Sequence, residues 1–370
     1  MATIIQTTLV IAILSTIFAL ILTIADKYIA DYGEVKLTIN DEEYTVEGGN
    51  SLLSTLRDQK IFIPSACGGK GSCGYCKVKV KSGGGPVLAT EKPHLSEEEM
   101  ADDVRLSCQV KLREDMKILI PEELFNVREF ETKLVEKKEL TDKITLFRFE
   151  LPEGEEIEFK PGQYVQLRAE AYPGTDEYDE SDEEVYRAYS IASSKLDKKH
   201  IELLIGYTKG IATTYAHKVL KEGDDVMING PYGDFYYRDE DSEIILGAAG
   251  TGFAPIRSIL YHMLDNDIKR PARFYFGAKT PDDLFLLDEL EMFKEKLYDF
   301  EFIPVLSRTT EEMNWKGETG HADDAIRKLV KDGSNKSAYL CGSPRMIESL
   351  ISALTDVGVP EDKIYYDNFS

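Results

Sequence analysis

The sequence predicts a multidomain protein: a single N-terminal transmembrane helix, a small strand-rich domain, an antiparallel β-barrel domain and an α/β domain with a parallel sheet. Three observations predict it: an uncharged apolar run at residues 2–25, four cysteines between residues 67 and 108, and a strand–helix alternation from residue 240. A chain of 370 residues has room for two or three such domains. We expect an anchor at 1–26 and domains at 33–125, 129–238 and 240–370.

The composition excludes two broad classes of protein. Asp and Glu number 67 against 44 Lys and Arg, which gives a formal net charge of −23. Such a chain is repelled by phosphate backbones, so we expect no nucleic-acid partner. The hydrophobic fraction of 42% excludes a mainly disordered chain.

The N-terminal run is long enough to cross a membrane. Ile4–Ile24 is nearly all apolar, and about 20 such residues span the hydrocarbon core as a helix. A cleavable signal peptide is the main alternative. It requires a basic residue before the run and a small-residue cleavage site after it, and the sequence has no clear example of either. We therefore predict an uncleaved anchor, whose balanced flanking charges give no orientation.

Residues 33–125 are expected to form a small domain rich in strands and loops. Val35–Ile39 and Tyr44–Val46 alternate as in a β-hairpin, with a turn at Asn40-Asp41. A short helix at Leu52–Gln59 and strands at Lys77–Val80 and Lys117–Ile120 complete the expected elements.

Four of the five cysteines belong to a single pattern within this domain. The spacing is Cys67-x5-Cys73-x2-Cys76, followed by 31 residues and then Cys108. Zinc sites usually pair their ligands in two short motifs, and disulfide frameworks are typical of shorter secreted chains. Three cysteines in one glycine-rich loop with a distant fourth resemble plant-type ferredoxins and favour a 2Fe–2S cluster, with zinc and disulfides as alternatives. Because such clusters are assembled in the cytoplasm, we expect all residues after 26 to lie on the cytoplasmic face of the membrane.

Residues 129–238 are expected to form an antiparallel barrel with one helix near Ile211–Leu220. The expected strands are Lys143–Glu150, Gln163–Arg168, Ala188–Ala192, Ile201–Tyr207 and Asp225–Asn229. An acidic stretch at 170–184 carries eight acidic residues and no base; it is either a solvated loop or a docking patch.

Three short motifs in this barrel indicate a flavin site. In Arg187-Ala188-Tyr189-Ser190, an arginine can neutralise a pyrophosphate, a tyrosine can pack on a ring, and a serine can bond a ring nitrogen. Gly210 and Thr213 then open a helix, a typical anion site. The turn Gly230-Pro231-Tyr232-Gly233 follows. Each motif alone is weak, and an ordinary strand is the alternative for the first; their order is far more specific.

The α/β domain has a glycine loop after its first strand. The expected strands are Ile244–Leu246, Arg273–Phe276, Phe302–Leu306 and Ala338–Leu340, with helices near Ile256–Leu264 and Met346–Val357. The glycines are spaced G-x-x-G-x-G, and small residues let a pyrophosphate approach a helix N-terminus. A plain strand–helix turn is the alternative. We predict nucleotide contacts at Gly247, Gly250, Thr251, Gly252 and Pro255.

Cys341 and Gly342 end the fourth strand, at the sheet edge where ligands bind in open α/β folds. We expect them beside the nicotinamide, although core packing is the alternative for a lone cysteine. Nucleotide preference rests on opposing signals: Ser307-Arg308 suits a 2′-phosphate, whereas Asp282 and Asp283 would repel it and bond ribose hydroxyls. We expect NADH.

In this order the motifs resemble the ferredoxin-NADP reductase-like superfamily. From the anchor to the tail Tyr365–Ser370, the chain is similar to the F subunits of the sodium-translocating NADH:quinone reductases. The resemblance implies a β-grasp ferredoxin domain, a FAD-binding barrel and an NADH-binding domain. It implies cluster ligands at Cys67, Cys73, Cys76 and Cys108, flavin contacts at Arg187, Tyr189, Ser190, Gly210 and Thr213, and catalytic roles for Cys341 beside the nicotinamide and Phe369 over the flavin.

The resemblance further implies an electron-entry subunit. A hydride would pass from NADH to FAD, and single electrons would pass through the cluster to other membrane subunits of a respiratory complex and indirectly to quinone. Such a protein is single-pass in the cell inner membrane, with catalytic domains in the cytoplasm. Any sodium transport would belong to its partners, because the anchor has few polar residues.

Two features depart from that family. The segment before Arg187 is short and acidic, and Thr251-Gly252-Phe253 resembles the loop of oxygenase reductases. A membrane-tethered NAD(P)H-dependent reductase that serves an oxygenase or another soluble acceptor is therefore the alternative. A membrane-anchored zinc-binding interaction module is the non-enzymatic alternative.

Overall fold

The computed structural model describes residues 6, 8–9, 11–19, 32–121, 124 and 127–368. Internal contacts divide the chain into two compact units, Met1–Ile63 with Gly69–Asn126, and Pro64–Gly68 with Val127–Ser370. Residues 11–19 are helical and expose apolar side chains such as Leu14 and Phe18. No helix among the described residues is long and apolar enough to span a bilayer. Much of the expected anchor at 1–26 lies outside the described residues.

Within its described residues, the first unit forms a five-stranded mixed sheet in the order β2-β1-β5-β3-β4. Its elements are β1 (Glu34–Ile39), β2 (Glu42–Glu47), α2 (Leu52–Asp58), β3 (Lys77–Ser82), α3 (Glu97–Ala101), β4 (Val104–Leu106) and β5 (Met116–Leu119). Strands β1 and β5 run parallel, and the other neighbours are antiparallel. Ser51 caps α2, which buries Leu52 and Leu56 in the core. The expected hairpin and helix are confirmed, in a β-grasp arrangement.

The second unit begins with an antiparallel sheet, six-stranded in its described part, in the order β10-β7-β6-β11-β8-β9. Its elements are β6 (Arg128–Glu139), β7 (Ile144–Glu150), β8 (Tyr164–Ala169), β9 (Val185–Ser190), β10 (His200–Gly206), α4 (Ile211–Thr214) and β11 (Asp225–Tyr232). A bridge between Ile191 and Leu203 joins the two edges of the sheet. The expected antiparallel barrel is therefore present as a sheet that partly closes on itself.

Two of the expected elements of this barrel take a different form in the structure. The expected helix at 211–220 is α4 followed by a π-helical turn at Tyr215–Val219, in which Leu220 N donates to Tyr215 O at 2.9 Å. This wider turn places a ring nitrogen of His217 3.0 Å from the carbonyl oxygen of Ile205. Strand β9 begins at Val185 and ends at Ser190, because residues 191–193 leave it to contact β10.

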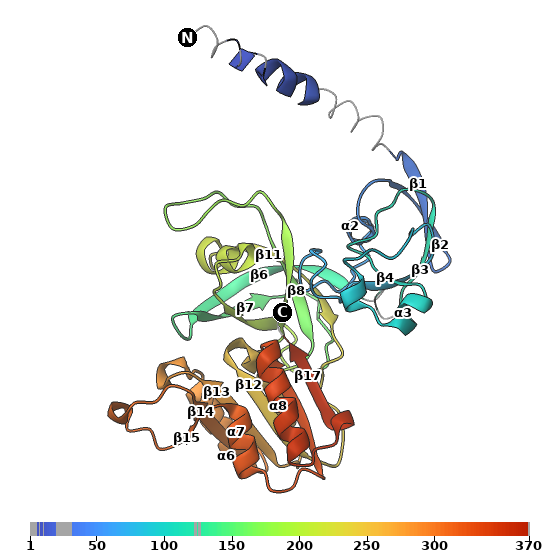
Figure 1. Cartoon of the computed structure of the whole chain (residues 1–370). Coiled ribbons are helices and arrows are strands. Elements are labelled where there is room, and N and C mark those ends of the chain that lie inside the picture. The colour runs from blue at the N-terminus through green and yellow to red at the C-terminus, as the bar shows by residue number, and fades with distance from the viewer. Residues whose placement is uncertain are drawn as a thin grey trace. The chain divides into compact units, whose positions relative to one another are not determined.

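The remainder of the second unit is a parallel sheet with helices between its strands (Figure 1). Its elements are β12 (Glu243–Ala249), α5 (Phe253–Asp265), β13 (Ala272–Ala278), α6 (Leu287–Lys296), β14 (Phe300–Leu306), β15 (Glu318–Thr319), α7 (Ala322–Leu329), β16 (Lys336–Gly342), α8 (Pro344–Asp356) and β17 (Ile364–Asn368). The strand order is β15-β14-β13-β12-β16-β17. The chain changes direction across the sheet between β12 and β16, and ligands bind at the carboxyl ends of strands beside such a point.

The barrel and the parallel-sheet half share one apolar core. Leu146, Ala192 and Leu204 of the barrel belong to the same buried cluster as Phe253 and Phe274 of the parallel-sheet half. Burial of this kind is the main source of stability between packed elements, so it holds the two halves together.

Candidate functional site

The cysteine-rich loop leads from α2 into β3, and Cys108 follows β4. The Cys76 side chain is buried and is hydrogen-bonded with Cys108; this contact and burial together raise the pKa of Cys76. Two thiolates held this close repel each other unless a cation lies between them. The pair is therefore a donor set that fits a metal centre, and a 2Fe–2S cluster takes two such pairs.

The glycines of this loop allow close packing around the thiols. Gly71 and Gly74 adopt φ angles of +76° and +73°, which side chains disfavour. A Cβ at Gly71 would lie 2.6 Å from the Gln109 amide nitrogen. That amide in turn donates to Cys108 Sγ at 3.5 Å. The loop is thus shaped to bring polar hydrogens up to the sulfur atoms.

Sequence reasoning missed Ser107, which lies directly before the fourth cysteine. Its side chain is fully buried and its hydroxyl has no hydrogen-bond partner by geometry among the described residues, yet it lies close enough to Cys76 to lower the pKa of that thiol. A buried hydroxyl without a partner costs free energy, so an acceptor at this place is expected. Among the described residues, no group of three or more His, Cys, Asp or Glu side chains is arranged to bind a single metal ion.

The flavin motif lies on β9. Arg187 and Tyr189 are two residues apart and therefore share a face of the strand, while Ser190 faces the other way and is buried. Burial raises the pKa of Tyr189 although Arg187 opposes the shift, so its hydroxyl stays protonated. The Thr213 hydroxyl donates to Gly210 O at 3.1 Å. In this structure it stabilises the turn that begins α4.

The glycine loop and the expected nicotinamide residues meet at the centre of the parallel sheet. Gly247 lies within β12, which continues to Ala249. Gly250–Gly252 then form a 3₁₀ turn before α5, whose first turn contains Pro255. A Cβ at Gly252 would lie 2.2 Å from the carbonyl oxygen of Cys341. Only glycine lets the loop lie against β16 at this point. Thr251 faces the end of β10, since its methyl carbon would be 3.3 Å from a Cβ at Gly206.

Cys341 is fully buried, and burial raises the pKa of its thiol, with Asp367 adding to the shift. The side chain therefore stays a neutral thiol and is no nucleophile at neutral pH. Its neighbour Gly342 packs against Met346, whose sulfur would lie 3.0 Å from an added Cβ. Phe369, the expected flavin cover, lies outside the described residues.

A cavity of about 1250 Å³ follows the carboxyl ends of the parallel strands. Both halves of the second unit line it: the barrel contributes the β6–β7 connection, and the parallel sheet contributes residues after β12, β13, β14 and β16. Its lining includes Gly250, Asp282, Asp283 and Ser307. The size and position suit a dinucleotide whose reactive end reaches the barrel.

The two opposing signals for nucleotide preference both lie on this cavity. Asp283 Oδ2 accepts from the amide and hydroxyl of Thr280 at 2.9 and 3.0 Å, so that carboxylate is engaged in capping its own turn. Asp282 is exposed beside it. The Ser307 hydroxyl donates to Ala278 O at 3.3 Å. Arg308, its neighbour in the sequence signal, is not among the lining residues.

Three family models match successive parts of the chain. Residues 37–113 match a 2Fe-2S iron-sulfur cluster binding domain, residues 131–237 an oxidoreductase FAD-binding domain, and residues 246–351 an oxidoreductase NAD-binding domain. The cofactor classes predicted from the sequence are confirmed by these matches.

Solved structures with similar folds include two reductases. An Amycolatopsis cytochrome P450 reductase superposes with a TM-score of 0.70 at 26% identity, covering 90% of this chain and 98% of that one. A ferredoxin reductase in carbazole 1,9a-dioxygenase gives a TM-score of 0.69 at 21% identity, covering 91% and 98%. The second likeness concerns the fold alone.

Curated relatives extend over nearly the whole chain. The F subunit of the Na(+)-translocating NADH-quinone reductase of Neisseria meningitidis serogroup C is 34% identical over an alignment of 389 positions, which covers 95% of this chain and 96% of the relative. The F subunit of the Idiomarina loihiensis enzyme is 33% identical over an alignment of 395 positions, covering 96% and 97%. The chain therefore belongs to the family of Na(+)-translocating NADH-quinone reductase F subunits.

Proposed function

We propose that this chain is the electron-entry subunit of a membrane NADH:quinone oxidoreductase. The observation that carries the proposal is the cavity at the switch point of the parallel sheet, lined by both the nucleotide half and the flavin barrel. NADH, FAD and a 2Fe–2S cluster, when bound, would supply hydride donation, the conversion of a hydride into single electrons, and one-electron transfer. Transfer of this kind depends on position more than on an acid or base.

The residues of the chain then have distinct roles. Cys67, Cys73, Cys76 and Cys108 hold the cluster, and Arg187, Tyr189 and Ser190 hold the flavin. The loop Gly250–Gly252 would admit the pyrophosphate, and Cys341, whose side chain is fully buried at the end of β16, would lie behind the nicotinamide as a neutral thiol. We also propose the four-part division at 1–26, 33–125, 129–238 and 240–370.

We propose that residues 1–26 anchor the chain in the inner membrane with a single pass, and that partner subunits pass its electrons to quinone. The uncharged run at 2–25 and the exposed apolar side chains of residues 11–19 support this. The test is purification of the full-length protein from its native membranes in mild detergent. Co-migrating polytopic subunits and NADH-dependent quinone reduction are the expected result.

The same purification distinguishes the second candidate function, a tethered reductase for an oxygenase. The likeness to a cytochrome P450 reductase over 90% of the chain favours this candidate. Recovery of the protein with a soluble oxygenase, and without quinone reduction, would support it and contradict the entry-subunit proposal.

Ser107→Ala is expected to lower the midpoint potential of the cluster. A hydrogen bond to a cluster sulfur stabilises the reduced, more negative state. Loss of one such bond costs about 1 kcal/mol, or roughly 40 mV for a one-electron couple. A spectroscopic redox titration measures the shift. Ser72→Ala removes an exposed hydroxyl from the same loop and should leave the potential unchanged. Equal potentials in the unaltered chain, Ser107→Ala and Ser72→Ala would contradict a hydrogen bond from Ser107 to the cluster.

Asp282→Asn is expected to raise the NADPH-to-NADH ratio of kcat/KM by about tenfold, since it removes a charge that repels the 2′-phosphate. Asp283→Asn is the matched comparison. Because Asp283 caps the turn at Thr280, its loss should weaken both nucleotides alike and leave the ratio near that of the unaltered chain. If Asp283→Asn changes the NADPH-to-NADH ratio and Asp282→Asn does not, Asp283 and not Asp282 is the residue that repels the 2′-phosphate.

A further inference from the structure

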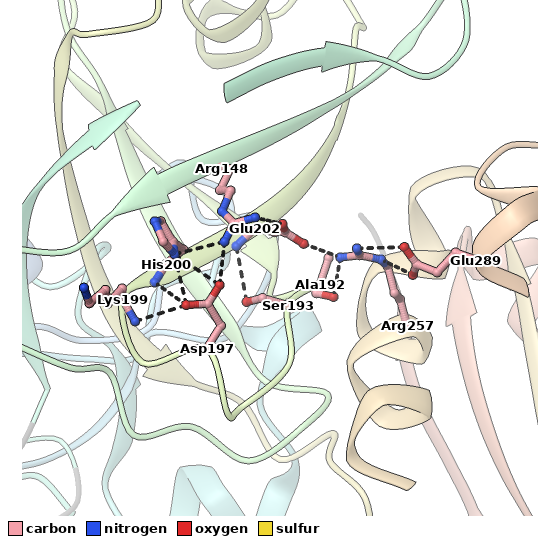
Figure 2. A network of polar contacts seen from close by, with 9 residues as sticks. All are labelled: Arg148, Ala192, Ser193, Asp197, Lys199, His200, Glu202, Arg257 and Glu289. Carbon is pink, nitrogen blue, oxygen red and sulfur yellow. Dashed lines mark hydrogen bonds and ion pairs between the residues drawn. The ribbon is translucent and has the colours of Figure 1, made fainter. Parts of the chain in front are cut away.

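A buried arginine connects the two halves of the second unit. Arg257 lies on α5, two residues after Pro255 of the glycine loop, and its side chain is only 5% exposed. Burial of a cation is costly unless it is fully paired. The partners of this guanidinium come from both halves, as Figure 2 shows.

The two sides of the guanidinium bind different halves. Nε and one terminal nitrogen donate to the Glu289 carboxylate of α6 at 2.6 and 3.0 Å, in the forked geometry that favours arginine. The other terminal nitrogen donates to Ala192 O at 2.8 Å and to Glu202 Oε2 at 2.6 Å, both in the barrel. A lysine has no planar fork and cannot make both sets of contacts in this geometry.

The next residue repeats the connection. Ser258 is fully buried, and its hydroxyl donates to Ser193 O at 2.9 Å. Ser193 Oγ in turn accepts the Glu202 amide at 3.2 Å. Residues 192–193 therefore receive bonds from two consecutive residues of α5.

The barrel side of this contact is itself braced. Arg148 of β7 pairs with Glu202 at 3.4 Å and with Asp197 at 2.8 Å, and Asp197 also contacts His200 (Figure 2). Glu202 is thus held between two arginines, one from each half of the second unit.

These bonds join the two cofactor motifs. Residues 192–193 directly follow β9, which carries Arg187, Tyr189 and Ser190, and α5 directly follows the glycine loop. We propose that Arg257 is a positioning residue that, with Ser258, fixes the flavin-motif strand against the nucleotide-loop helix and so sets the approach of the nicotinamide to the flavin. The approach of the nicotinamide to the flavin rests on the proposed function; the connection between the strand and the helix does not.

The test compares Glu202→Gln, Glu289→Gln and Arg257→Lys in the full-length protein. Glu202→Gln weakens the arm that crosses between the halves and keeps the side-chain volume, whereas Glu289→Gln weakens the arm within the parallel-sheet half. Arg327→Gln is the matched control, because Arg327 pairs with Asp323 and Asp356 on the surface of that same half.

Two readouts are needed. In amide hydrogen exchange, Glu202→Gln and Arg257→Lys should speed exchange in residues 190–193 and in the first turn of α5, and Glu289→Gln should do so less. In stopped-flow flavin reduction, the same two variants should lower the limiting rate constant about tenfold, since small displacements of reacting groups are costly. The half-saturating NADH concentration should change less than about twofold, and Arg327→Gln should match the unaltered chain.

The opposite results would overturn the proposal. Unchanged exchange at residues 190–193 in Glu202→Gln would show that Arg257 does not hold the two halves together. A weaker NADH affinity at an unchanged limiting rate would show that Arg257 does not position the nicotinamide against the flavin. Failure of the unaltered, flavin-loaded chain to react with NADH would instead overturn the proposed function, and hydrogen exchange would still decide whether the connection exists.

Discussion

Cys73→Ala is expected to abolish the 2Fe–2S cluster and NADH-dependent quinone reduction, while flavin reduction by NADH continues at its original rate. Cys73, Cys76 and Cys108 lie in the first compact unit; Cys67 lies in the short segment Pro64–Gly68, which groups with the second unit, where the flavin and nucleotide motifs also lie. A cluster that loses one thiolate ligand is not held. Iron content and the visible and electron paramagnetic resonance spectra measure the first effect, and stopped-flow absorbance of the flavin measures the second.

The exposed neighbour provides the control for this experiment. Ser72→Ala changes the same loop without removing a ligand, so cluster content and quinone reduction should equal those of the unaltered chain. If Cys73→Ala also stops flavin reduction, the two units do not work independently, and the modular account of the chain fails.

Gly252→Ala is expected to weaken NADH binding severely. The added Cβ would lie 2.2 Å from Cys341 O and 2.8 Å from its carbonyl carbon, both backbone atoms that no rotamer change can move. The loop or β16 must therefore shift, at the place where we propose that the pyrophosphate binds. Forced overpacking costs about 1–3 kcal/mol, which corresponds to roughly a 5- to 150-fold rise in the dissociation constant for NADH. Titration of the oxidised protein with a non-reducing nicotinamide analogue measures it.

Gly277→Ala is the matched comparison for this prediction. It adds the same methyl group at the end of the neighbouring strand β13, where the nearest atom would be 3.7 Å away, an ordinary contact distance. A much smaller loss of affinity is expected. Equal losses in the two variants would show that any added bulk near the cavity is harmful, and that the contact between Gly252 and Cys341 has no special importance.

Much of the fold could be predicted from alternation and glycine punctuation. Val35, Leu37 and Ile39 alternate with polar residues, and all three are buried in β1 as expected. Strand β6 was missed because most of its residues are charged. Its buried positions Phe130 and Leu134 are separated by a buried threonine, a weak signal beside so many charges. Residues 128–139 form a strand because they pair with β7 and β11 in the folded sheet.

The cofactor classes were predicted from motifs, and the contacts between the motif residues were not. The sequence predicts that Gly252 and Cys341 both contact the nucleotide. It does not show that position 252 must lack a side chain because the backbone of Cys341 lies against it. Arg257 carried a usable signal: it is a single cation in the apolar stretch 253–261, and a buried cation needs partners. Its partners lie 55 and 32 residues away, so only the fold could identify them.

Strand β5 has a consequence for how the protein is made. It is the last strand of the first unit, yet it lies between β1 and β3, so neither the β1–β2 hairpin nor the β3–β4 pair has its central neighbour until residues 116–119 exist. Cys67, Cys73, Cys76 and Cys108 precede it in the chain, and Cys341 follows it. N-terminal domains fold as units during synthesis. A nascent chain that ends before Met116 therefore carries Cys67, Cys73, Cys76 and Cys108 without the strand that joins the two strand pairs of the sheet.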